Sequence, residues 1–387
     1  MTINKVISAS TRDFADAVKW AAKTSGGQIR MDIGKEDTVL YFSSFVDTNS
    51  SKAKIDVNFV SGKQGNHTFV VSSSLLMNSL KLIKGNEFTI TVTSSQMVIK
   101  AGRSVVNLPI IKSSDEILVP PLPEVAGRVS IADFRKAINS VTLAASNDDT
   151  TVALMSIHCA FSPKNKTLSF VATDRYKMML RTIPFEPIAD AEGNLAEDFS
   201  MNVMASSMKT LISGLPTTDA TIDIHTVAGG SQLVIRDVNY MTGVGIVDGQ
   251  FVQYEKFLEM PFEHKIKVEL AELKGAIDGI TTLLTGEEGI TLTFSHGECV
   301  VSSVTNVGST VIVSEGSIAP TEGNDDEPAL RVVFGSKIIR PGLSSLSSKF
   351  VELHYNKPTT PWVIKELDDA TGKVLDTSFT LLMPVRA

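Results

Sequence analysis

Apolar residues recur along this chain at the three- and four-residue spacing that places side chains on one face of an α-helix. Three such stripes, each after a short β-like run, resemble one another closely. They are formed by Phe14, Ala17, Val18 and Ala21, by Phe134, Ala137, Ile138 and Val141, and by Leu273, Ala276, Ile277 and Ile280.

A second kind of stripe alternates with the first, each time between two β-like runs. Its members are Leu76, Ser79, Leu80 and Ile83, then Met208, Leu211, Ile212 and Leu215, then Ile339, Gly342, Leu343 and Leu346. The pattern predicts six similar units in three pairs, with a period of roughly 65 residues inside one of roughly 130. Units that repeat in this way usually stack or close on one another.

The segments between the helices alternate Val, Ile, Thr and Phe with polar residues, which predicts half-buried strands. Clear cases are residues 88–92, 220–224 and 290–294. Each helix has only one apolar stripe, so the two helices and two sheets of a pair of units must cover one another. The predicted fold class is α+β, with three similar domains that each pack two helices on two small antiparallel sheets.

Two boundaries divide the repeat into these domains. The closely spaced prolines of Val119-Pro120-Pro121-Leu122-Pro123 cannot continue a helix or a central strand, so this segment is predicted to be a linker. The second boundary lies near residue 262, just before the β-like run of residues 265–268. The predicted domains are residues 1–127, 128–262 and 263–387, which agrees with the usual size of about 100–200 residues per domain.

Composition places the chain among ordinary globular proteins. It is 43% hydrophobic and 20% charged, with a formal net charge of −7. This charge argues against a protein whose whole surface binds nucleic acid, because such proteins usually carry a basic excess. Cys159 and Cys299 have no nearby ligand cluster, so neither a zinc site nor a disulfide framework is expected. The absence of a signal-like or membrane-spanning segment, together with the two isolated cysteines, predicts a cytoplasmic location.

Basic residues concentrate in the predicted helices. Twelve Lys and Arg against five Asp and Glu fall in six helix windows, which are 11–23, 73–84, 131–144, 206–215, 270–284 and 336–349. The windows therefore carry +7 and the rest of the chain −14. If the six helices share one surface, that surface suits contact with phosphates without base reading. Otherwise the charges are simply the solvated faces of amphipathic helices.

The most specific local motif is Phe170-Val171-Ala172-Thr173-Asp174-Arg175-Tyr176-Lys177-Met178. It resembles the strand-end motif of the bacterial β sliding clamp family, the processivity subunits of DNA polymerase III. Further segments agree with that family in order and spacing, namely residues 14–18, 101–104, 148–154 and 381–387. Any one of these motifs is weak, but together with the repeat the resemblance covers essentially the whole chain.

The resemblance implies a head-to-tail homodimer that forms a ring, with helices lining a hole for duplex DNA and sheets outside. A diffuse positive lining would hold DNA regardless of sequence, because weak, screened phosphate contacts permit sliding. The candidate lining residues are Lys23, Arg30 (expected in the loop after the first helix), Lys81, Arg135, Lys136, Lys209, Lys274, Lys337 and Arg340. The implied protein partners are the DNA polymerase III catalytic subunit, the clamp loader and other replication and repair proteins with a clamp-binding motif. No cofactor, metal or membrane partner is implied.

The family's second working surface is an apolar pocket for short linear peptides of these partners, which insert one or two apolar anchors. The matching positions are Leu154, Thr173, Arg175, Tyr176, Lys177, Met178, Val252, Lys256, Phe257, Thr359, Pro361, Leu381, Leu382, Met383, Pro384, Val385 and Arg386. Val252 stands where the family usually has proline, which leaves the shape of the rim loop and the peptide preference open. For residues 381–385 the alternative is a plain terminal strand in a core.

An enzyme is not expected. The chain has no Gly-x-x-x-x-Gly-Lys-Ser/Thr loop, no His-Glu-x-x-His and no Gly-x-Ser-x-Gly elbow, and its six histidines are scattered. The predicted function is a DNA sliding clamp, a non-catalytic accessory subunit of a DNA polymerase. The alternative is a non-enzymatic, β-rich structural or assembly protein of repeated modules, which would have no reason to concentrate basic residues on helices.

Overall fold

The computed structural model of the chain describes residues 5–111, 121–189, 192–213, 215, 220–284, 288–295, 297–316 and 330–385. Within this part the chain forms two compact units. Unit 1 takes its residues from 1–131, 187–196 and 206–246, and unit 2 takes its residues from 132–186, 197–205 and 247–387. The predicted middle domain contributes to both units, and the division into three domains stays a prediction.

Six helices each begin at the residue that follows the end of a strand, and this arrangement confirms the predicted repeat. The pairs are β1 (Lys5–Ser10) with α1 (Thr11–Ala22), β5 (His67–Ser72) with α2 (Ser73–Ser79), β9 (Val125–Ser130) with α3 (Ile131–Val141), β14 (Phe199–Met204) with α4 (Ala205–Ile212), β18 (His264–Glu269) with α6 (Leu270–Thr281), and β22 (Leu330–Gly335) with α7 (Ser336–Ser344). Apart from Ala205, all six helices lie inside the predicted windows. The short helix α5 (Glu255–Leu258) and the 3-10 turn η1 (Val152–Met155) do not follow from the periodicity.

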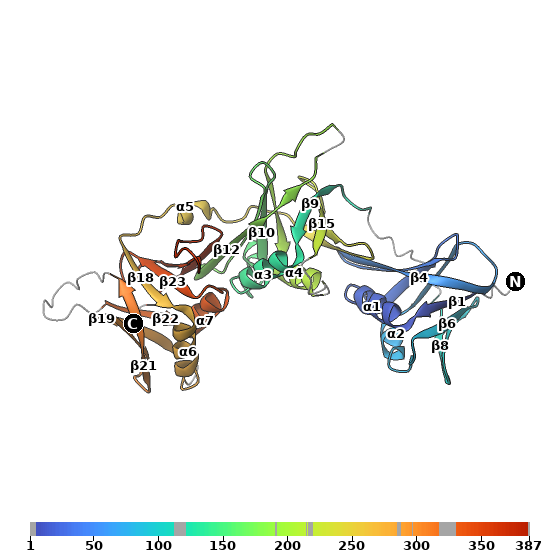
Figure 1. The fold of residues 1–387 in the computed structure, drawn as a ribbon, viewed down its shortest axis with the longest axis horizontal. Coiled ribbons are helices and arrows are strands. Elements are labelled where there is room, and N and C mark those ends of the chain that lie inside the picture. The colour runs from blue at the N-terminus through green and yellow to red at the C-terminus, as the bar shows by residue number, and fades with distance from the viewer. Residues whose placement is uncertain are drawn as a thin grey trace. The chain divides into compact units, whose positions relative to one another are not determined.

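Two antiparallel sheets share one long strand in unit 1. The remaining strands of this unit are β2 (Gln28–Ile33), β3 (Val39–Val46), β4 (Asn49–Gly62), β6 (Glu87–Val92), β7 (Gln96–Ala101), β8 (Ser104–Pro109), β15 (Thr221–His225), β16 (Gln232–Arg236) and β17 (Tyr240–Val247). One sheet has the order β4-β1-β6-β7-β8 and the other has the order β5-β2-β3-β4-β17-β16-β15-β9. Helix α1 lies against the sheets of this unit (Figure 1), and the ring of its Phe14 packs edge-on against Phe42 and Phe88, with centroids 5.4 and 4.8 Å away.

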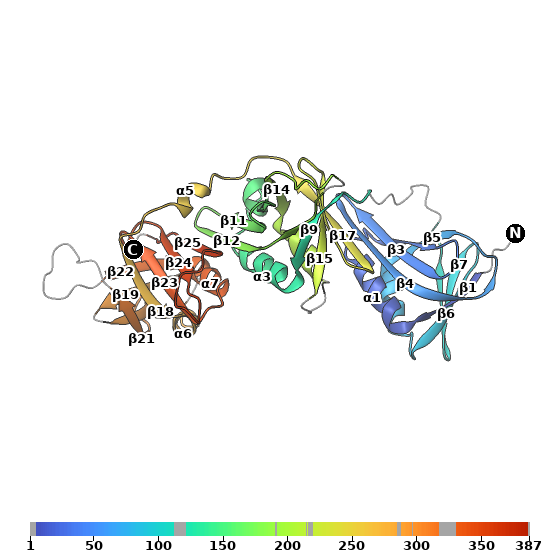
Figure 2. The ribbon, with the colours of Figure 1, turned by 45° about the horizontal axis from the view of Figure 1, so that its top comes forward.

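Unit 2 repeats this plan. Its remaining strands are β10 (Ser156–Ser162), β11 (Thr167–Thr173), β12 (Lys177–Pro184), β19 (Gly289–Ser295), β20 (Glu298–Ser303), β21 (Ser309–Gly316), β23 (Phe350–Tyr355), β24 (Trp362–Glu366) and β25 (Ser378–Leu382), with the two-residue β13 (Glu186–Pro187) where the units meet in sequence. The sheets run β14-β10-β11-β12-β25-β24-β23-β18-β21 and β22-β19-β20-β21, all antiparallel. Figure 2 shows β23, β24 and β25 beside α7 in this unit. The predicted α+β class is confirmed.

Each unit contains one strand pair that joins segments far apart in the sequence. In unit 1 the first seam pairs β4 with β17, with Ala53 opposite Tyr240. In unit 2 the second seam pairs β12 with β25, with Arg181 opposite Ser378. An equivalent backbone hydrogen bond extends each seam by one residue. The N–H of Lys54 donates to the carbonyl of Asn239 at 2.9 Å, and the N–H of Thr182 donates to the carbonyl of Thr377 at 2.8 Å. The two seams are therefore built in the same register.

Candidate functional site: an apolar cavity and the basic helices

An apolar cavity of about 410 Å³ opens on unit 2. Its lining residues are Leu154, Thr173, Arg175, Lys177, Met178, Val252, Gln253, Lys256, Phe257, Pro361, Leu381 and Met383. All except Gln253 belong to the predicted pocket, although they come from five separate segments of the chain. Met178 and Leu381 face each other across the second seam, so this strand pair forms part of the cavity wall.

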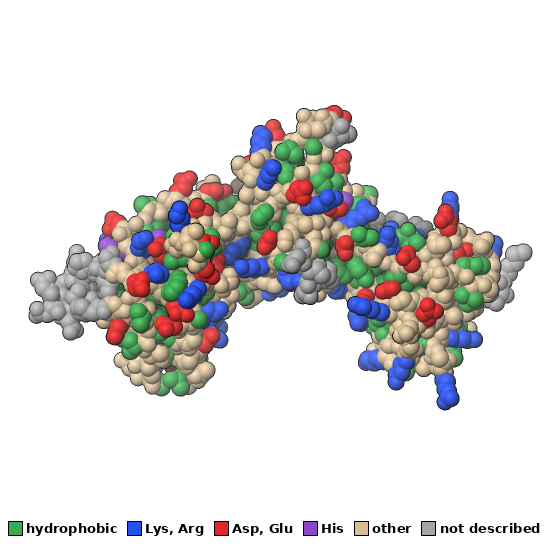
Figure 3. Space-filling model, in the orientation of Figure 1, with side chains coloured by type: hydrophobic (Ala, Val, Ile, Leu, Met, Phe, Trp, Pro, Cys, Tyr) green, Lys and Arg blue, Asp and Glu red, His purple; other side chains and the backbone are tan. Residues whose placement is uncertain are grey.

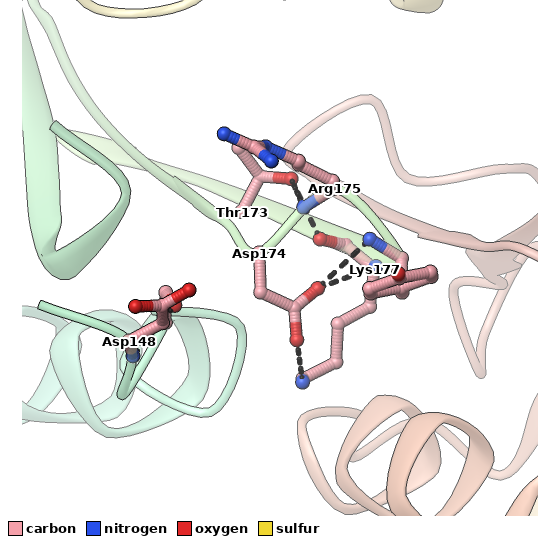
Figure 4. Close-up of polar contacts among 7 residues, drawn as sticks. Asp148, Thr173, Asp174, Arg175 and Lys177 are labelled. Atoms are coloured by element: carbon pink, nitrogen blue, oxygen red, sulfur yellow. Dashed lines mark hydrogen bonds and ion pairs between the residues drawn. The ribbon is translucent and has the colours of Figure 1, made fainter. Parts of the chain in front are cut away.

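A tight turn between β11 and β12 supplies three of the lining residues, and Figure 4 shows its polar contacts. Asp174 Oδ1 accepts hydrogen bonds from the backbone N–H groups of Tyr176 and Lys177, at 3.0 and 2.8 Å. Thr173 Oγ1 accepts a hydrogen bond from the N–H of Arg175 at 3.1 Å and donates one to the carbonyl of Lys177 at 2.8 Å. Short polar side chains that bond nearby backbone in this way stabilise turns. The Thr-Asp pair of the motif therefore shapes this edge of the cavity.

The loop that carries Val252 and Phe257 is anchored by a histidine. The ring of His158 stacks on Phe251, with centroids 5.0 Å apart and planes inclined by 15°. His158 Nδ1 lies 2.8 Å from Asn202 Oδ1, and Asn202 Nδ2 donates to the carbonyl of Gly249 at 2.8 Å. Burial lowers the pKa of His158, so its ring is neutral at pH 7. Sequence reasoning missed this anchor because a single histidine in a strand carries no motif.

The side chains of β25 and the residues after it point alternately to the cavity and to the core. Successive side chains of a strand point to opposite faces, and accordingly Leu381 and Met383 line the cavity while Leu382 is buried in the core that packs on α7. The N–H of Met383 donates to the carbonyl of Tyr176 at 2.8 Å, which ties the tail to the turn. Leu382 thus fits the alternative of a plain core strand, whereas its neighbours Leu381 and Met383 line the cavity.

The other predicted pocket residues lie outside the lining. The side chain of Tyr176 is exposed, and the N–H of Val385 donates to the carbonyl of Val333 at 2.8 Å. Thr359 and Pro384 belong to the described residues but do not line the cavity. Arg386 lies outside the described residues.

A buried arginine crosses the second seam. Arg181 is 8% exposed, and its guanidinium donates to the carbonyls of Phe379 and Ser345 and to the hydroxyls of Ser345 and Thr380, at 2.9 to 3.2 Å. Burial lowers the pKa of Arg181 to about 10, and the nearby Glu366 opposes this shift. Since every one of these partners lies on β25 or at the end of α7, the side chain fastens β12 to both.

The predicted DNA-binding residues lie on or beside the helices, with one exception. Lys23 and Lys81 follow α1 and α2, Arg135 and Lys136 lie on α3, Lys209 lies on α4, Lys274 lies on α6, and Lys337 and Arg340 lie on α7. The exception is Arg30, which was expected in a loop. It lies in β2, because Ile29, Met31 and Ile33 alternate inward, and its Nε donates to Asp32 Oδ2 at 3.0 Å.

Two of these basic side chains have distinctive surroundings. The Lys23 Nζ lies 4.4 Å from the centroid of the Trp20 ring, and burial lowers the pKa of Lys23 to about 8. Arg340 Nε donates to Asp278 Oδ1 of α6 at 2.9 Å. Figure 3 shows Lys and Arg side chains beside α1 and α2 in unit 1 and beside α7 in unit 2, with acidic side chains among them. The helices thus present a mixed surface with basic clusters rather than a uniformly positive one.

Sequence comparison finds similar proteins among the bacterial β sliding clamps. The β sliding clamp of Streptomyces coelicolor is 21% identical over 380 residues, which cover 96% of each chain. The β sliding clamp of Helicobacter pylori is 19% identical over 396 residues, which cover 98% of this chain and 99% of the other. The chain is thus similar to bacterial β sliding clamps over nearly its whole length. No protein-family model matches the sequence.

Solved structures show the same clamp fold. The DNA polymerase sliding clamp of Bacillus subtilis superposes with a TM-score of 0.83 at 16% identity, covering 99% of this chain and 100% of the other. The H. pylori β clamp bound to a DNA ligase peptide gives a TM-score of 0.79 at 18% identity, with both chains fully covered. Across the described residues, no helix is long and apolar enough to cross a membrane. The same residues contain no group of three or more His, Cys, Asp or Glu that could hold a metal ion.

Proposed function

We propose that this chain is a DNA sliding clamp that encircles duplex DNA as a head-to-tail homodimer and tethers a replicative polymerase and other partners. The observation that carries this proposal is the convergence of Leu154, Met178, Phe257, Leu381 and Met383 on one apolar cavity, at positions matched to the peptide pocket of the family. Such a cavity suits the apolar anchors of a linear peptide. One of the similar clamps carries a DNA ligase peptide, which supports the same kind of partner here.

The two seams support the proposed homodimer. β4 and β12 occupy the same place in their units of the repeat, as do β17 and β25, and each seam pairs one strand of each kind. The strand that corresponds to β4 and β12 in the last third of the chain is β21, and the strand that corresponds to β17 and β25 in the first third is β8. Each ends its sheet among the described strands, since β8 pairs only with β7, and residues 309–313 of β21 pair only with β20. Pairing β21 with β8 of a second copy would close a ring of two chains.

Exposed apolar side chains support this closing seam. Val105 on β8 is 55% exposed, Val311 on β21 is 54% exposed, and Val307 just before β21 is 62% exposed. The register of the two internal seams places Ser309 opposite the partner's Val105 and Thr310 opposite the partner's Ser104. In that register the partner's Val105 is the diagonal neighbour of both Val307 and Val311, close enough for aliphatic contact. Pairing would therefore cover the exposed edge and its valines together.

The basic helices supply the proposed contacts to DNA. Phosphate contacts of this kind carry no sequence information and weaken with salt, which suits a protein that must move along the duplex. The proposed role needs no catalysis, and the clamp acts as a non-catalytic accessory subunit of a DNA polymerase in the cytoplasm. The clamp loader and the polymerase III catalytic subunit are the proposed protein partners.

A disulfide test addresses the closing seam. The double variant Ser309→Cys with Val105→Cys places two cysteines directly opposite each other, where Cα atoms about 4.5–5.5 Å apart permit a disulfide. Cys159 and Cys299 are buried, burial raises both thiol pKa values, and neither should compete. We expect a covalent dimer on mild oxidation. The control, Ser309→Cys with Ser104→Cys, places the side chains on opposite faces of the pair and should stay uncrosslinked.

Retention on DNA tests the whole proposal. The protein is loaded on nicked circular DNA with a clamp loader, and the circle is then linearised. A closed ring should remain on the circle and slide off the free ends. Retention after linearisation, or a native mass equal to the 41.7 kDa of one chain, would contradict the ring.

A further inference from the structure

A second cavity, of about 490 Å³, lies over the first seam in unit 1. Its lining includes Lys52 and Lys54 of β4, Arg236 at the end of β16, and Tyr41 of β3. The strands β3, β4 and β17 lie side by side at this place (Figure 2). Because these four side chains come from strands, this seam cavity is separate from the helices to which the proposed function assigns duplex DNA.

The two lysines and the tyrosine point to one face of the sheet. Lys52 and Lys54 flank Ala53, which is 1% exposed, and successive side chains of a strand point to opposite faces, so both lysines point away from the core. Tyr41 lies opposite Lys54 on the neighbouring strand and shares its face. The Lys52 Nζ lies 5.0 Å from the centroid of the Tyr41 ring. This ring is half-buried and forms part of the cavity wall.

The arginine belongs to the same face. Lys52 lies opposite Met241 of β17, and Met241 lies opposite Arg236 of β16. Residues that face each other across neighbouring strands point to the same side of the sheet. From strand geometry, Lys54 lies about 7 Å from Lys52 along β4, and Arg236 lies about 10 Å from Lys52 across two strand spacings. The three cations are thus spread over the face, as an extended ligand with several phosphates would require.

These three cations form no ion pair with a carboxylate in the part of the chain that the structure describes. Asp223 lies opposite Arg236, but its carboxylate pairs with Arg128 at 2.7 Å. The carboxylate in the lining, that of Asp237, accepts a hydrogen bond from the N–H of Val238 at 2.6 Å, within the turn between β16 and β17. The seam cavity therefore carries an excess of positive charge, which attracts an anion.

The pairing of the strands does not require these cations. Leu180 and Thr182 take the places of the two lysines in the second seam, which is built in the same register. Leu180 packs in an apolar cluster with Phe379, the residue opposite it. The same face is therefore covered by apolar packing in unit 2 and presents cations to a cavity in unit 1. Binding of a ligand accounts for this difference, whereas strand pairing does not.

We propose that the seam cavity binds single-stranded nucleic acid, with Lys52, Lys54 and Arg236 contacting neighbouring phosphates and a base stacking on Tyr41. Proteins that bind single strands combine a positively charged groove with aromatic rings in this way. A duplex cannot bring a base to the ring, because its bases are already paired and stacked. An acidic peptide would meet the cations but offer no base to the tyrosine, and a free nucleotide would reach fewer of the cations.

Fluorescence polarisation with a labelled oligo-dT and the full-length protein tests the inference. The triple variant Lys52→Gln with Lys54→Gln and Arg236→Gln should bind an oligo-dT of about 12 nucleotides roughly fivefold to tenfold more weakly at low salt. Each phosphate contact to a single strand contributes about 0.7 to the slope of log K against log salt concentration, so the slope should become shallower by about 2.

The matched control removes three exposed lysines of unit 2 instead, as Lys164→Gln with Lys166→Gln and Lys373→Gln. It changes the net charge by the same amount and should alter the affinity for oligo-dT less than about twofold. An equal loss in the control would show that net charge, and not the seam cavity, determines the binding, and would overturn the inference.

Variants of the tyrosine and a crosslink locate the strand. Tyr41→Ala should weaken binding about fivefold, whereas Tyr41→Phe keeps the ring and should bind as the wild type does. Ultraviolet crosslinking with an oligonucleotide that contains 5-iodouracil, followed by mass spectrometry, should yield a crosslinked peptide that contains Tyr41. The triple variant should give much less of this product. A triple variant that keeps both the wild-type affinity and this crosslink would contradict the inference.

Competitors identify the class of ligand. Unlabelled oligo-dT should suppress the crosslink at Tyr41, whereas dTTP, a poly-Glu peptide of equal charge and duplex DNA should suppress it much less. Equal suppression by dTTP, by poly-Glu or by duplex would mean that the seam cavity binds free nucleotides, acidic proteins or any DNA, and the inference would be wrong. The retention of the protein on circular duplex DNA tests the proposed function separately, because it does not depend on this cavity.

Discussion

Asp278 on α6 accepts a hydrogen bond from Nε of Arg340 on α7 at 2.9 Å, so one helix of this pair partly neutralises a basic side chain of the other. Both side chains are about half exposed. A solvated ion pair of this kind adds little to stability. It does, however, engage the Arg340 guanidinium, which we propose contacts a DNA phosphate.

Asp278→Asn should therefore strengthen DNA binding without a large change in melting temperature. We expect roughly twofold to fivefold tighter binding at low salt, and a steeper salt dependence because one more phosphate contact releases counterions. The measurement is binding to duplex DNA over a series of salt concentrations. The control is Asp223→Asn, which breaks the 2.7 Å pair with Arg128 between strands β15 and β9. An equal gain from the control would show that net charge, and not Arg340, is responsible.

The pKa of Lys23 gives DNA binding a pH dependence. Burial beside Trp20 lowers this pKa to about 8, so the ammonium is charged at pH 7 and mostly neutral at pH 9. If Lys23 contacts phosphate, affinity should fall roughly twofold to fivefold over that interval. Lys23→Arg keeps the charge and should remove this part of the dependence, whereas Lys81→Arg at the end of α2 should not. A wild-type affinity that is flat from pH 7 to 9 would exclude Lys23 from the contact.

The helices were predictable because their buried side chains recur at a regular three- and four-residue spacing. Phe14, Ala17, Val18 and Ala21 are all buried, and the spacing of these four residues alone specifies the face of α1. Arg30 shows where such reasoning needs care. The alternation of Ile29, Met31 and Ile33 around it predicts a strand once it is read at a period of two, and the loop assignment ignored that signal.

The cavity was predictable only through the resemblance. Its walls come from five segments, and no period along the chain connects Leu154 with Met383. The seams were not predictable either, because opposing residues such as Ala53 and Tyr240 are nearly 190 positions apart and local pattern does not encode such pairings. Gln253 and His158 carry no motif, so only the folded loop reveals their positions.

Arg181 should be a large determinant of stability. Arg181→Met removes the donor for four acceptors on β25 and at the end of α7, and it leaves the buried Glu366 without its nearby cation. Deleting one partner of a buried charged network costs about 3–5 kcal/mol. Urea denaturation of the full chain, followed by circular dichroism, would measure the change in unfolding free energy.

The conservative variant separates charge from shape at this position. Arg181→Lys keeps a cation but can donate to fewer acceptors at once, so it should recover only part of the loss. A loss below about 1 kcal/mol for Arg181→Met would show that the second seam does not depend on this side chain.

The stacked pair of His158 and Phe251 should control the affinity of the cavity for peptides. Val252 stands where the resemblance to sliding clamps leads us to expect proline, so the loop of residues 249–257 lacks that restraint on its backbone. The stack, with the Asn202 bond to Gly249, supplies a tertiary restraint instead. Without the stack the loop must be ordered at the moment of binding, which lowers affinity.

His158→Ala and Phe251→Ala should each weaken peptide binding roughly threefold to tenfold, and the double variant should be little worse than either, since both remove the same contact. Fluorescence polarisation with one labelled peptide measures all three. His67→Ala, which removes a ring that faces Phe69 at 5.9 Å in unit 1, is the matched control. Fully additive losses would mean that His158 and Phe251 act on the loop separately, and unchanged affinity in all three would mean that the rim is held by its other contacts.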